Sequence, residues 1–486
     1  MASNMVKKFK TKYDRMSIQA KASIWFIICS FLQKGISIIT TPIFTRLMST
    51  SEYGKFNVFT SWQGIITAVV ILNLPYGVLS QGIVKFTETR EKFTSALLGL
   101  MTALTAIWIG IYLFVRDFAN SVFTLTTVQM ICMLLMIWAT SVFNFWAVVQ
   151  RVDYKYRKLV AVTLFTSFAK PVLGIIMVIN SDDKVTARIL GLTIVELVAY
   201  IGMYVSLMRR GKALFDARIW AYGLKFSTPL IPHYLSQKIL GSADRIMIDR
   251  MISSDAAGIY SLAYQISQIM LILNQSLMQA IEPWYFRKLK EHREGDIGRI
   301  AYSTMLMVAL ANLMVIVFAP EIIFLFAPPS YHDSIWVISP IAMSVFFMYV
   351  YNYFVEIEFY YENTKWISFA TLMAAGLNIV LNFIFIRIFG YFAAGYTTLF
   401  CYMAYSIFHY IVMNRVSGGM GKKVFDLKKL LLISGGFLIS GTLITFTYNY
   451  PVIRYGIIVV LMVAAIIRRR DVIRLVKEIA EMKGKK

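Results

Sequence analysis

Long apolar runs alternate with short polar segments along the whole chain, and this alternation predicts the secondary structure. Most runs contain about 20 residues, which is enough for a helix to cross the hydrocarbon core of a bilayer. We expect about fourteen transmembrane helices, at residues 22–45, 56–83, 93–115, 121–149, 159–179, 189–207, 226–249, 259–282, 300–318, 334–358, 367–388, 394–413, 430–447 and 453–467. The predicted fold class is an all-α polytopic membrane protein.

One pattern of polar and charged residues occurs twice, 204 positions apart. Lys34 corresponds to Lys238 and Ser49 to Ser253. The flanking residues also correspond, since Gln33, Arg46, Gly54 and Phe56 have Gln237, Arg250, Gly258 and Tyr260 as counterparts. Each half contains six predicted helices, so both halves enter the membrane from the same side, as in a parallel repeat. We therefore predict two pseudo-symmetric six-helix lobes followed by two C-terminal helices.

The polar segments between the runs predict the domain organisation. We expect a cytoplasmic basic N-terminus at 1–21, an N-lobe at 22–207, a cytoplasmic inter-lobe linker at 208–225, a C-lobe at 226–413, helices 13 and 14 with their preceding loop at 414–467, and a basic cytoplasmic tail at 468–486. Within the second helix, Asn73-Leu74-Pro75 predicts a kink.

Composition agrees with a membrane location. The 486 residues are 58% hydrophobic and only 15% charged, whereas a soluble protein carries about 25% charged residues. The formal net charge of +23 would suggest nucleic-acid binding in a soluble protein. Here 37 of the 49 Lys and Arg residues fall in the segments assigned to the cytoplasm and 8 in external segments. Topology explains this bias, so we expect both termini in the cytoplasm and no nucleic-acid partner.

The sequence lacks the common signatures of enzymes and metal sites. It contains no H-E-x-x-H, no G-x-S-x-G and no phosphate-binding loop, because the segment 418–423 has neither the spacing nor the hydroxyl residue. Cys29, Cys132 and Cys401 all lie in apolar runs without metal or disulfide spacing. We therefore expect a transporter, with no catalytic residue, no metal site and no cofactor.

Three lysines lie near the middle of predicted spans: Lys34, Lys170 and Lys238. A lysine at this depth costs about 2.5–3.5 kcal/mol on insertion scales unless it meets water or a partner. Such residues indicate a hydrated cationic cavity that binds an anion. The alternative is structural pairing, which would join Lys170 to Glu196 in the next helix.

Further charges lie nearer the predicted outer end of helix 7. Arg245 is a candidate cavity residue, and its alternative is an ion pair with Asp249 one turn away. The acidic candidates for ion coupling are Glu196, Asp244 and Asp249.

A stripe of amides follows one face of the helix predicted at 259–282. At 100° per residue, Gln265, Gln268, Gln275 and Gln279 share an arc of about 100° with Glu282. Amides can donate to and accept from sugar hydroxyls, which suits a glycan-binding cavity. Hydrogen bonding between helices is the alternative.

Helices 10 and 12 are rich in tyrosine. The residues concerned are Tyr349, Tyr351, Tyr353, Tyr360, Tyr361, Tyr402 and Tyr405, with His409 on the same face as the last two. Stacking on sugar rings is one interpretation, and an aromatic belt at the membrane interface is the one we favour. We expect Glu356 and Glu358, at the inner end of helix 10, to be hydrated.

Four stretches resemble bacterial polysaccharide flippases of the Wzx type. They are Thr45 to Gly54, Asp244 to Tyr260, Pro320 to Tyr331 and Gly390 to Gly395. The resemblance covers essentially the whole chain and places it in the multidrug/oligosaccharidyl-lipid/polysaccharide exporter superfamily. It implies two six-helix lobes with alternating access in the bacterial plasma membrane.

The resemblance also implies a substrate and partners. The substrate would be an undecaprenyl-diphosphate-linked oligosaccharide repeat unit, moved to the outer leaflet for an O-antigen or capsule. An ion gradient of protons or sodium would drive transport. The implied partners are membrane lipids, a polysaccharide polymerase and a chain-length regulator.

Three other functions remain open from the sequence. A multidrug exporter of the same superfamily handles mainly cationic drugs, which Lys34 disfavours. A lipid II flippase is a closer alternative, because its substrate is also an anionic lipid-linked sugar. A membrane glycan polymerase or ligase would be expected to have a large external loop, and the external loops predicted here are short.

Overall fold

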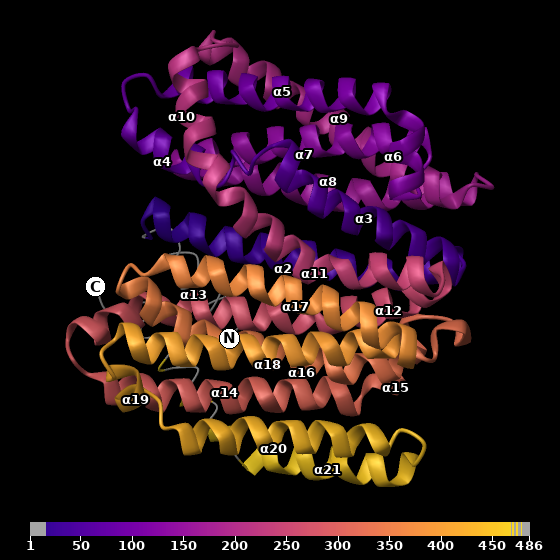
Figure 1. The fold of residues 1–486 in the computed structure, drawn as a ribbon, viewed down its shortest axis with the longest axis vertical. Coiled ribbons are helices and arrows are strands. Elements are labelled where there is room, and N and C mark those ends of the chain that lie inside the picture. The colour runs from indigo at the N-terminus through magenta and orange to yellow at the C-terminus, as the bar shows by residue number, and fades with distance from the viewer. Residues whose placement is uncertain (1–15, 468, 471–472, 475–477, 479–486) are drawn as a thin grey trace, which may run out of the picture. The chain divides into compact units, whose positions relative to one another are not determined.

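The computed structural model describes residues 16–467, 469–470, 473–474 and 478. Within these residues all regular elements are helices (Figure 1). Ten helical segments of this part are long and apolar enough to cross a membrane. The expected all-α polytopic membrane fold is therefore confirmed. The predicted N-terminal segment 1–21 and tail 468–486 lie largely outside the described residues.

The chain forms two compact units, residues 1–235 and 236–486. The helices of the first unit run from indigo to magenta in Figure 1. Their bounds are α2 Ile18–Leu47, α3 Thr50–Val70, α4 Val78–Lys85, α5 Arg90–Phe114, α6 Arg116–Phe123, α7 Thr127–Val152, α8 Tyr156–Ile179, α9 Lys184–Gly211, α10 Ala217–Ser227 and the short 3₁₀ helix η1 Thr228–Leu230. Helix α11, Ile231–Met251, contains the boundary between the units.

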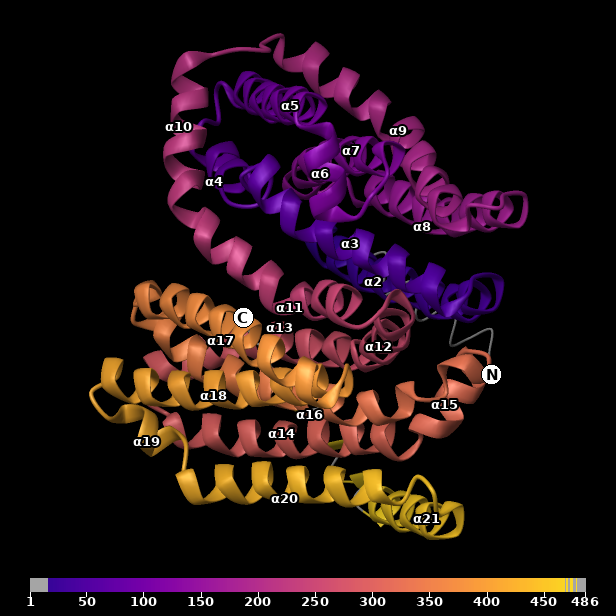
Figure 2. The same ribbon diagram turned by 45° about the vertical axis from the view of Figure 1, so that its right-hand side comes forward.

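The second unit contains the remaining helices. They are α12 Ser254–Ser267, α13 Ile269–Lys290, α14 Glu294–Val317, α15 Ala319–Phe326, η2 Pro329–Tyr331, α16 Ser334–Tyr360, α17 Thr364–Phe389, α18 Phe392–Val416, α19 Met420–Val424, α20 Leu427–Phe446 and α21 Pro451–Ile467. Helices α20 and α21 both pack against α14, and both views draw them on the same side of it (Figures 1 and 2).

The sequence repeat appears as a repeat of helix ends. Helix α2 ends at Leu47 and α11 ends at Met251, 204 residues later. Ser49 caps α3 by accepting a hydrogen bond from the Glu52 backbone N–H. Ser253 caps α12 in the same way, accepting from the backbone N–H of Ala256. A side-chain cap satisfies a backbone donor that has no partner within the helix. The same capping interaction therefore stabilises both turns.

Two predicted spans are interrupted in the structure. The second is divided into α3 and α4, because Leu72 and Asn73 have positive φ angles of 49° and 54° just before Pro75. The seventh was expected as one helix over 226–249 and consists of α10, η1 and α11. Pro229 and Pro232 lie at this interruption, where each removes a backbone donor. Within the predicted linker 208–225, residues 208–211 still belong to α9 and residues 217–225 belong to α10.

Two other boundaries differ from the sequence prediction. The fourth span begins at Thr127 and not at 121, because α6 occupies the external connection. The segment 283–299 was expected as a loop, yet α13 continues through Pro283 to Lys290.

A different helix organises the interior of each unit. In the first unit α9 packs against α3, α5, α7 and α8. In the second unit α16 packs against α12, α13, α14, α18 and α20. Both central helices carry buried polar side chains, among them Glu196 on α9 and Glu358 on α16. These helices therefore determine which polar groups meet inside each unit.

Candidate functional site

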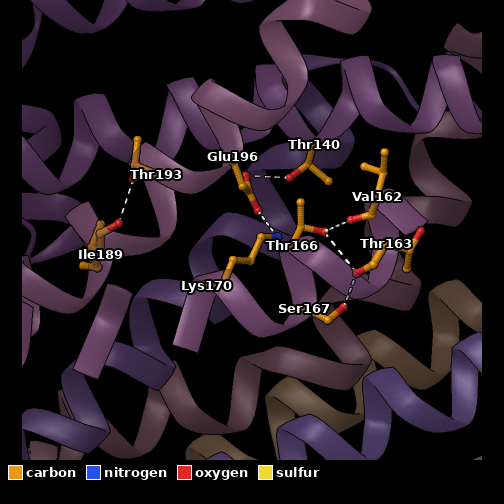
Figure 3. A network of polar contacts seen from close by, with 9 residues as sticks. All are labelled: Thr140, Val162, Thr163, Thr166, Ser167, Lys170, Ile189, Thr193 and Glu196. Atoms are coloured by element: carbon orange, nitrogen blue, oxygen red, sulfur yellow. Dashed lines mark hydrogen bonds and ion pairs between the residues drawn. The ribbon is translucent and has the colours of Figure 1, made fainter. Parts of the chain in front are cut away.

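An ion pair lies inside the first unit (Figure 3). The Lys170 Nζ of α8 is 2.5 Å from the Glu196 Oε1 of α9. The Thr140 hydroxyl of α7 donates to Glu196 Oε2 at 2.9 Å. The Glu196 side chain is only 4% exposed and that of Lys170 is 27% exposed. Three helices thus contribute to one carboxylate, and the structural pairing considered from the sequence is present.

Glycine brings the two helices of this pair close together. A Cβ atom placed on Gly191 of α9 would lie 2.9 Å from the Cα of Gly174 on α8. Small residues at such positions let helix backbones approach within a membrane protein. The approach brings Lys170 against Glu196, and it also brings the ammonium within 5.9 Å of the Tyr200 ring centroid.

Lys34 and Lys238 differ from Lys170 in having no recorded partner. Lys34 lies near the middle of α2 and Lys238 lies in α11, and both side chains are exposed. Within the described part of the chain, no ion pair or hydrogen bond is recorded for either ammonium group. A lysine in a spanning helix requires water or an anion, so both residues remain candidates for contact with an anionic ligand.

A buried carboxylate with neutral partners lies in the second unit. Asp244 of α11 is 2% exposed. Its carboxylate accepts hydrogen bonds from the Tyr260 hydroxyl at 2.7 Å, the Asn382 amide at 2.6 Å and the Thr398 hydroxyl at 2.9 Å. These partners come from α12, α17 and α18. Asp244 is thus the point at which four helices meet.

A second layer of polar groups surrounds these partners. The Asn382 amide also donates to Asn378 Oδ1 at 3.1 Å, and the Thr397 hydroxyl donates to Asn382 Oδ1. The described residues contain no group of three or more His, Cys, Asp or Glu residues that could hold a metal ion. Hydroxyl and amide oxygens beside a carboxylate can instead hold a proton or a small hard cation such as sodium. We call Asp244, Tyr260, Asn378, Asn382, Thr397 and Thr398 the Asp244 network.

Sequence reasoning singled out Asp244 but not its partners. Asn378 and Asn382 are one turn apart in an otherwise apolar helix, and Thr397 and Thr398 follow in the next helix. Polar residues one turn apart on an apolar helix indicate a hydrogen-bonded network inside the protein, because the hydrocarbon core offers such residues no partner.

The two charges that follow Asp244 do not form the ion pair that was considered as an alternative. The Arg245 guanidinium lies 4.3 Å from the Tyr264 ring centroid and donates to the Gly241 carbonyl. Asp249 accepts from the Ser254 hydroxyl at 2.6 Å. No salt bridge between Arg245 and Asp249 is recorded in the described chain, so the structure lacks the ion pair that was considered as the alternative. Each side chain instead contacts residues of α11 or of the following helix α12.

The glutamine stripe spans two helices instead of one. Gln265 lies in α12 and Gln268 at the junction where α13 begins, and both are half-buried. Gln275 and Gln279 lie in α13 and are exposed. Asn274 of α13 is buried and donates to the Val345 carbonyl at 2.9 Å. The four glutamines therefore remain candidates for contact with a ligand.

The belt interpretation of the tyrosines is wrong for most of them. Tyr349 and Tyr353 are fully buried, and Tyr402 and Tyr405 are 8% exposed. Glu358, expected to be hydrated, is also fully buried and lies 2.7 Å from His409. The cause is that α16 is enclosed by seven helices of the second unit, so its polar residues face protein.

A charged pocket of about 530 Å³ lies at the α7–α8 turn. Asp153 accepts from Arg90 at 2.6 Å and from Lys155 at 2.9 Å. Burial alone would raise the pKa of Asp153, but the hydrogen bonds from Lys155 and Arg90 outweigh burial and hold that pKa below its usual value. A hydrogen bond from Lys92 likewise lowers the pKa of Asp216. Both carboxylates therefore remain charged at neutral pH.

Two family models match the chain. The model described as "Polysaccharide biosynthesis protein" matches residues 20–289, and the MatE model matches residues 229–384. The Lsg locus putative protein 1 of Haemophilus influenzae is 24% identical over 229 residues, covering 43% of this chain and 55% of that protein. An uncharacterized membrane protein of the same species is 25% identical over 200 residues, covering 40% and 49%. The chain thus spans about half the length of these relatives.

Solved structures with a similar fold include a lipid II flippase and multidrug resistance transporters. The lipid II flippase MurJ in an inward closed conformation has a TM-score of 0.69 at 15% identity, covering 92% of this chain and all of that one. An inward-facing multidrug resistance MATE family transporter of the MOP superfamily has a TM-score of 0.60 at 13% identity, covering 80% and 95%. A point mutant of the Vibrio cholerae MATE transporter VcmN has a TM-score of 0.53 at 11% identity, covering 82% and 96%. At these identities the likeness concerns the fold.

Proposed function

Because the chain belongs to the polysaccharide biosynthesis protein family, we propose that it moves undecaprenyl-diphosphate-linked oligosaccharides across the bacterial plasma membrane. It is a membrane transporter or flippase with the fold of the MOP superfamily, and not an enzyme. Transport would run from the inner to the outer leaflet by alternating access, with both termini in the cytoplasm. Membrane lipids surround the protein, and a polymerase and a chain-length regulator would use its product.

One observation carries the substrate proposal. Lys34 and Lys238 occupy equivalent positions of the repeat, lie in spanning helices and are exposed without a recorded partner in the described residues. Their positive charge suits a diphosphate, which an ammonium can meet as a compact, mobile charge. In contrast, Glu196 already neutralises Lys170. We therefore assign Lys34 and Lys238 to the diphosphate and give Lys170 a supporting role.

The glycan requires polar groups that can form hydrogen bonds with sugar hydroxyls. Gln275 and Gln279 are exposed on α13, and Gln265 and Gln268 precede them half-buried. We propose that the exposed amides contact the sugar residues next to the diphosphate, while the lipid chain stays in the bilayer. Arg245 is not part of this contact, because it is already held by Tyr264 and Gly241.

Asp244 is the best-supported candidate for ion coupling. It is buried, and the hydroxyl and amide groups around it carry no charge that would neutralise the carboxylate. Binding a proton or a sodium ion would remove its buried negative charge, and this links ion occupancy to the packing of four helices. Glu196 is less suited, because Lys170 compensates its charge. Asp249 is only half-buried.

The test is glycan export in a strain that lacks its own flippase. Lys34→Glu and Lys238→Glu should each reduce export by about tenfold or more, because a reversed charge repels the diphosphate. Alanine at either position should reduce export less, and Lys34→Arg should retain part of it. Lys290→Glu, at the exposed end of α13, makes the same change of charge outside the proposed site and serves as the control.

Two measurements make this result decisive. The amount of each variant in the membrane separates loss of transport from loss of protein. Binding of a polyprenyl diphosphate to purified variants tests the contact directly, and lipid II is compared in parallel. Normal export by a well-expressed Lys34→Glu/Lys238→Glu double variant would overturn the proposal.

A further inference from the structure

Glu358 of α16 and His409 of α18 form a fully buried pair that the proposed function does not use. The Glu358 Oε1 and His409 Nδ1 are 2.7 Å apart, and both side chains are 0% exposed. Helices α16 and α18 are the most extensively packed pair of helices in the described chain. The pair lies outside the Asp244 network, because none of the recorded hydrogen bonds joins the two.

The surroundings of the pair are largely aromatic. The imidazole ring lies 4.4 Å from the Tyr405 ring, 5.8 Å from Phe408 and 5.9 Å from Tyr351, measured between centroids. The Tyr405 hydroxyl already shares a hydrogen bond with Thr371 of α17 at 3.1 Å. Within the described residues, His409 is the only cationic group recorded within 4.0 Å of Glu358.

Other charged groups lie on the neighbouring helices. Glu356 of α16 is half-buried and experiences the like charge of Glu282 of α13. Lys365 of α17 and Lys422 of α19 are exposed. The charge on the pair is therefore set by the protons that the pair itself holds.

Each member of the pair keeps one buried polar atom without a partner. Glu358 Oε2 and His409 Nε2 have no recorded hydrogen bond. An unsatisfied buried polar atom costs about 1–3 kcal/mol, so two of them on adjacent groups require an explanation. They are the free acceptor and the free ring nitrogen at which a proton can be gained or lost.

The net charge of the pair depends on the number of protons that it binds. With one shared proton it is neutral overall, as carboxylate and imidazolium or as carboxylic acid and imidazole. Removing that proton leaves one negative charge and adding another leaves one positive charge, and either is costly in a dry interior. The exchange therefore requires access to water. Glu358 is followed at once by exposed residues, since Phe359, Tyr360 and Tyr361 are 46%, 38% and 41% exposed.

We propose that Glu358 and His409 form a proton-binding site, separate from Asp244, that exchanges one proton when the end of α16 opens to water. The role of this site in transport rests on the proposed function, whereas the binding of the proton does not. A change in its protonation would alter how tightly α16 packs against α18. Transport would then depend on pH even where sodium drives the Asp244 site.

The experiment uses the full chain in lipid nanodiscs, with histidine labelled in the ring nitrogens. The protein has four histidines, and His409→Gln identifies the signal of interest. In a titration around neutral pH, we expect the His409 nitrogen signals to change together with an infrared band of a protonated carboxyl group. Glu358→Gln should remove that band, and His409→Gln should shift its pH dependence.

Two variants serve as controls. His292→Gln removes a side chain that is 86% exposed and should leave the infrared band unchanged. Asp244→Asn should also leave it unchanged, which separates the two sites. Asp153 and Asp216 do not contribute in this range, because their pKa values lie below the usual value.

The His409 signals of the wild-type protein decide the question even if a variant fails to fold. His409 signals and a carboxyl band that stay constant over this pH range, with and without a polyprenyl diphosphate present, would show a fixed pair and overturn the proposal. Failure of the Lys34 and Lys238 test would leave the spectroscopic result untouched, so the two proposals fail separately.

Discussion

Lys170 Nζ and Glu196 Oε1 are 2.5 Å apart, and the pair joins α8 to α9 inside the first unit. Thr140 adds a hydrogen bond from α7. Removing one member of a buried pair leaves an uncompensated charge, which costs about 3–5 kcal/mol. The packing of α7, α8 and α9 against one another therefore depends on both charges being present.

Substitutions of this pair should be strongly non-additive. Glu196→Gln and Lys170→Gln should each lower the melting temperature of the purified protein, while the double substitution should recover much of the loss. Gln275→Ala, on an exposed position of α13, is the neutral control. A double variant as unstable as the sum of both singles would show that the two charges do not stabilise one another.

Gly191 should be intolerant of larger side chains. A Cβ at this position would meet the backbone of Gly174 at 2.9 Å, so Gly191→Val should separate α8 from α9 and weaken the Lys170–Glu196 contact. We expect a loss of stability comparable to that of Glu196→Gln. Gly202→Val, where a Cβ meets nothing within 4 Å, is the matched control in the same helix. Equal melting temperatures for the two valine variants would contradict this expectation.

The two serine caps should contribute similar amounts to stability. Ser49→Ala and Ser253→Ala each remove a side chain that accepts from a backbone N–H at the start of a helix. Each should cost about 0.5–2 kcal/mol. Ser49→Asp should retain most of the stability, because aspartate also caps helices. Thermal unfolding of the purified variants measures the effect, and an unchanged Ser253→Ala protein would exclude the capping role in the second unit.

Asp244 should control the dependence of transport on an ion gradient. Asp244→Asn should abolish the stimulation of transport by a proton or sodium gradient, because the neutral amide cannot exchange charge. Thr398→Val removes one donor to Asp244 and should weaken ion affinity while leaving some stimulation. Separate gradients of the two ions in proteoliposomes identify the ion. Full stimulation of the Asp244→Asn protein by both gradients would rule out this site.

Cysteine labelling should confirm the orientation. A membrane-impermeant thiol reagent applied to intact cells should label Asp182→Cys and Asp255→Cys but not Lys290→Cys. The native residues Cys29, Cys132 and Cys401 are buried, so they contribute little background. Labelling of Lys290→Cys from outside, with Asp182→Cys protected, would reverse the predicted topology.

The sequence predicts the helices of this protein better than it predicts their contacts. Apolar runs, charge bias and the 204-residue repeat locate the spans, because length and hydropathy suffice for that purpose. They also raise the Lys170–Glu196 pair as one alternative, since the two charges lie in consecutive spans at similar depth.

The partners of Asp244 and the burial of Tyr349, Tyr353 and Glu358 did not follow from the sequence. Lipid and protein interior are similarly apolar, so hydropathy does not distinguish a helix face that meets lipid from one that meets protein. Helix α16 looks like any other span in the sequence, yet it is enclosed by its neighbours. Breaks such as the one after Gln268 also turned one predicted stripe into two segments.

The equivalent caps of Ser49 and Ser253 have a consequence for the surrounding bilayer. Each fixes a helix start three residues after the preceding helix ends, at Leu47 and at Met251. The turn between the two helices therefore has the same length in each half of the chain. A membrane that is too thin or too thick stores energy in tilt or local deformation, on the order of fractions of a kcal/mol per Å. Because each turn is capped, each half should respond to lipids of altered chain length by helix tilt and not by a shift of the helix ends at this turn.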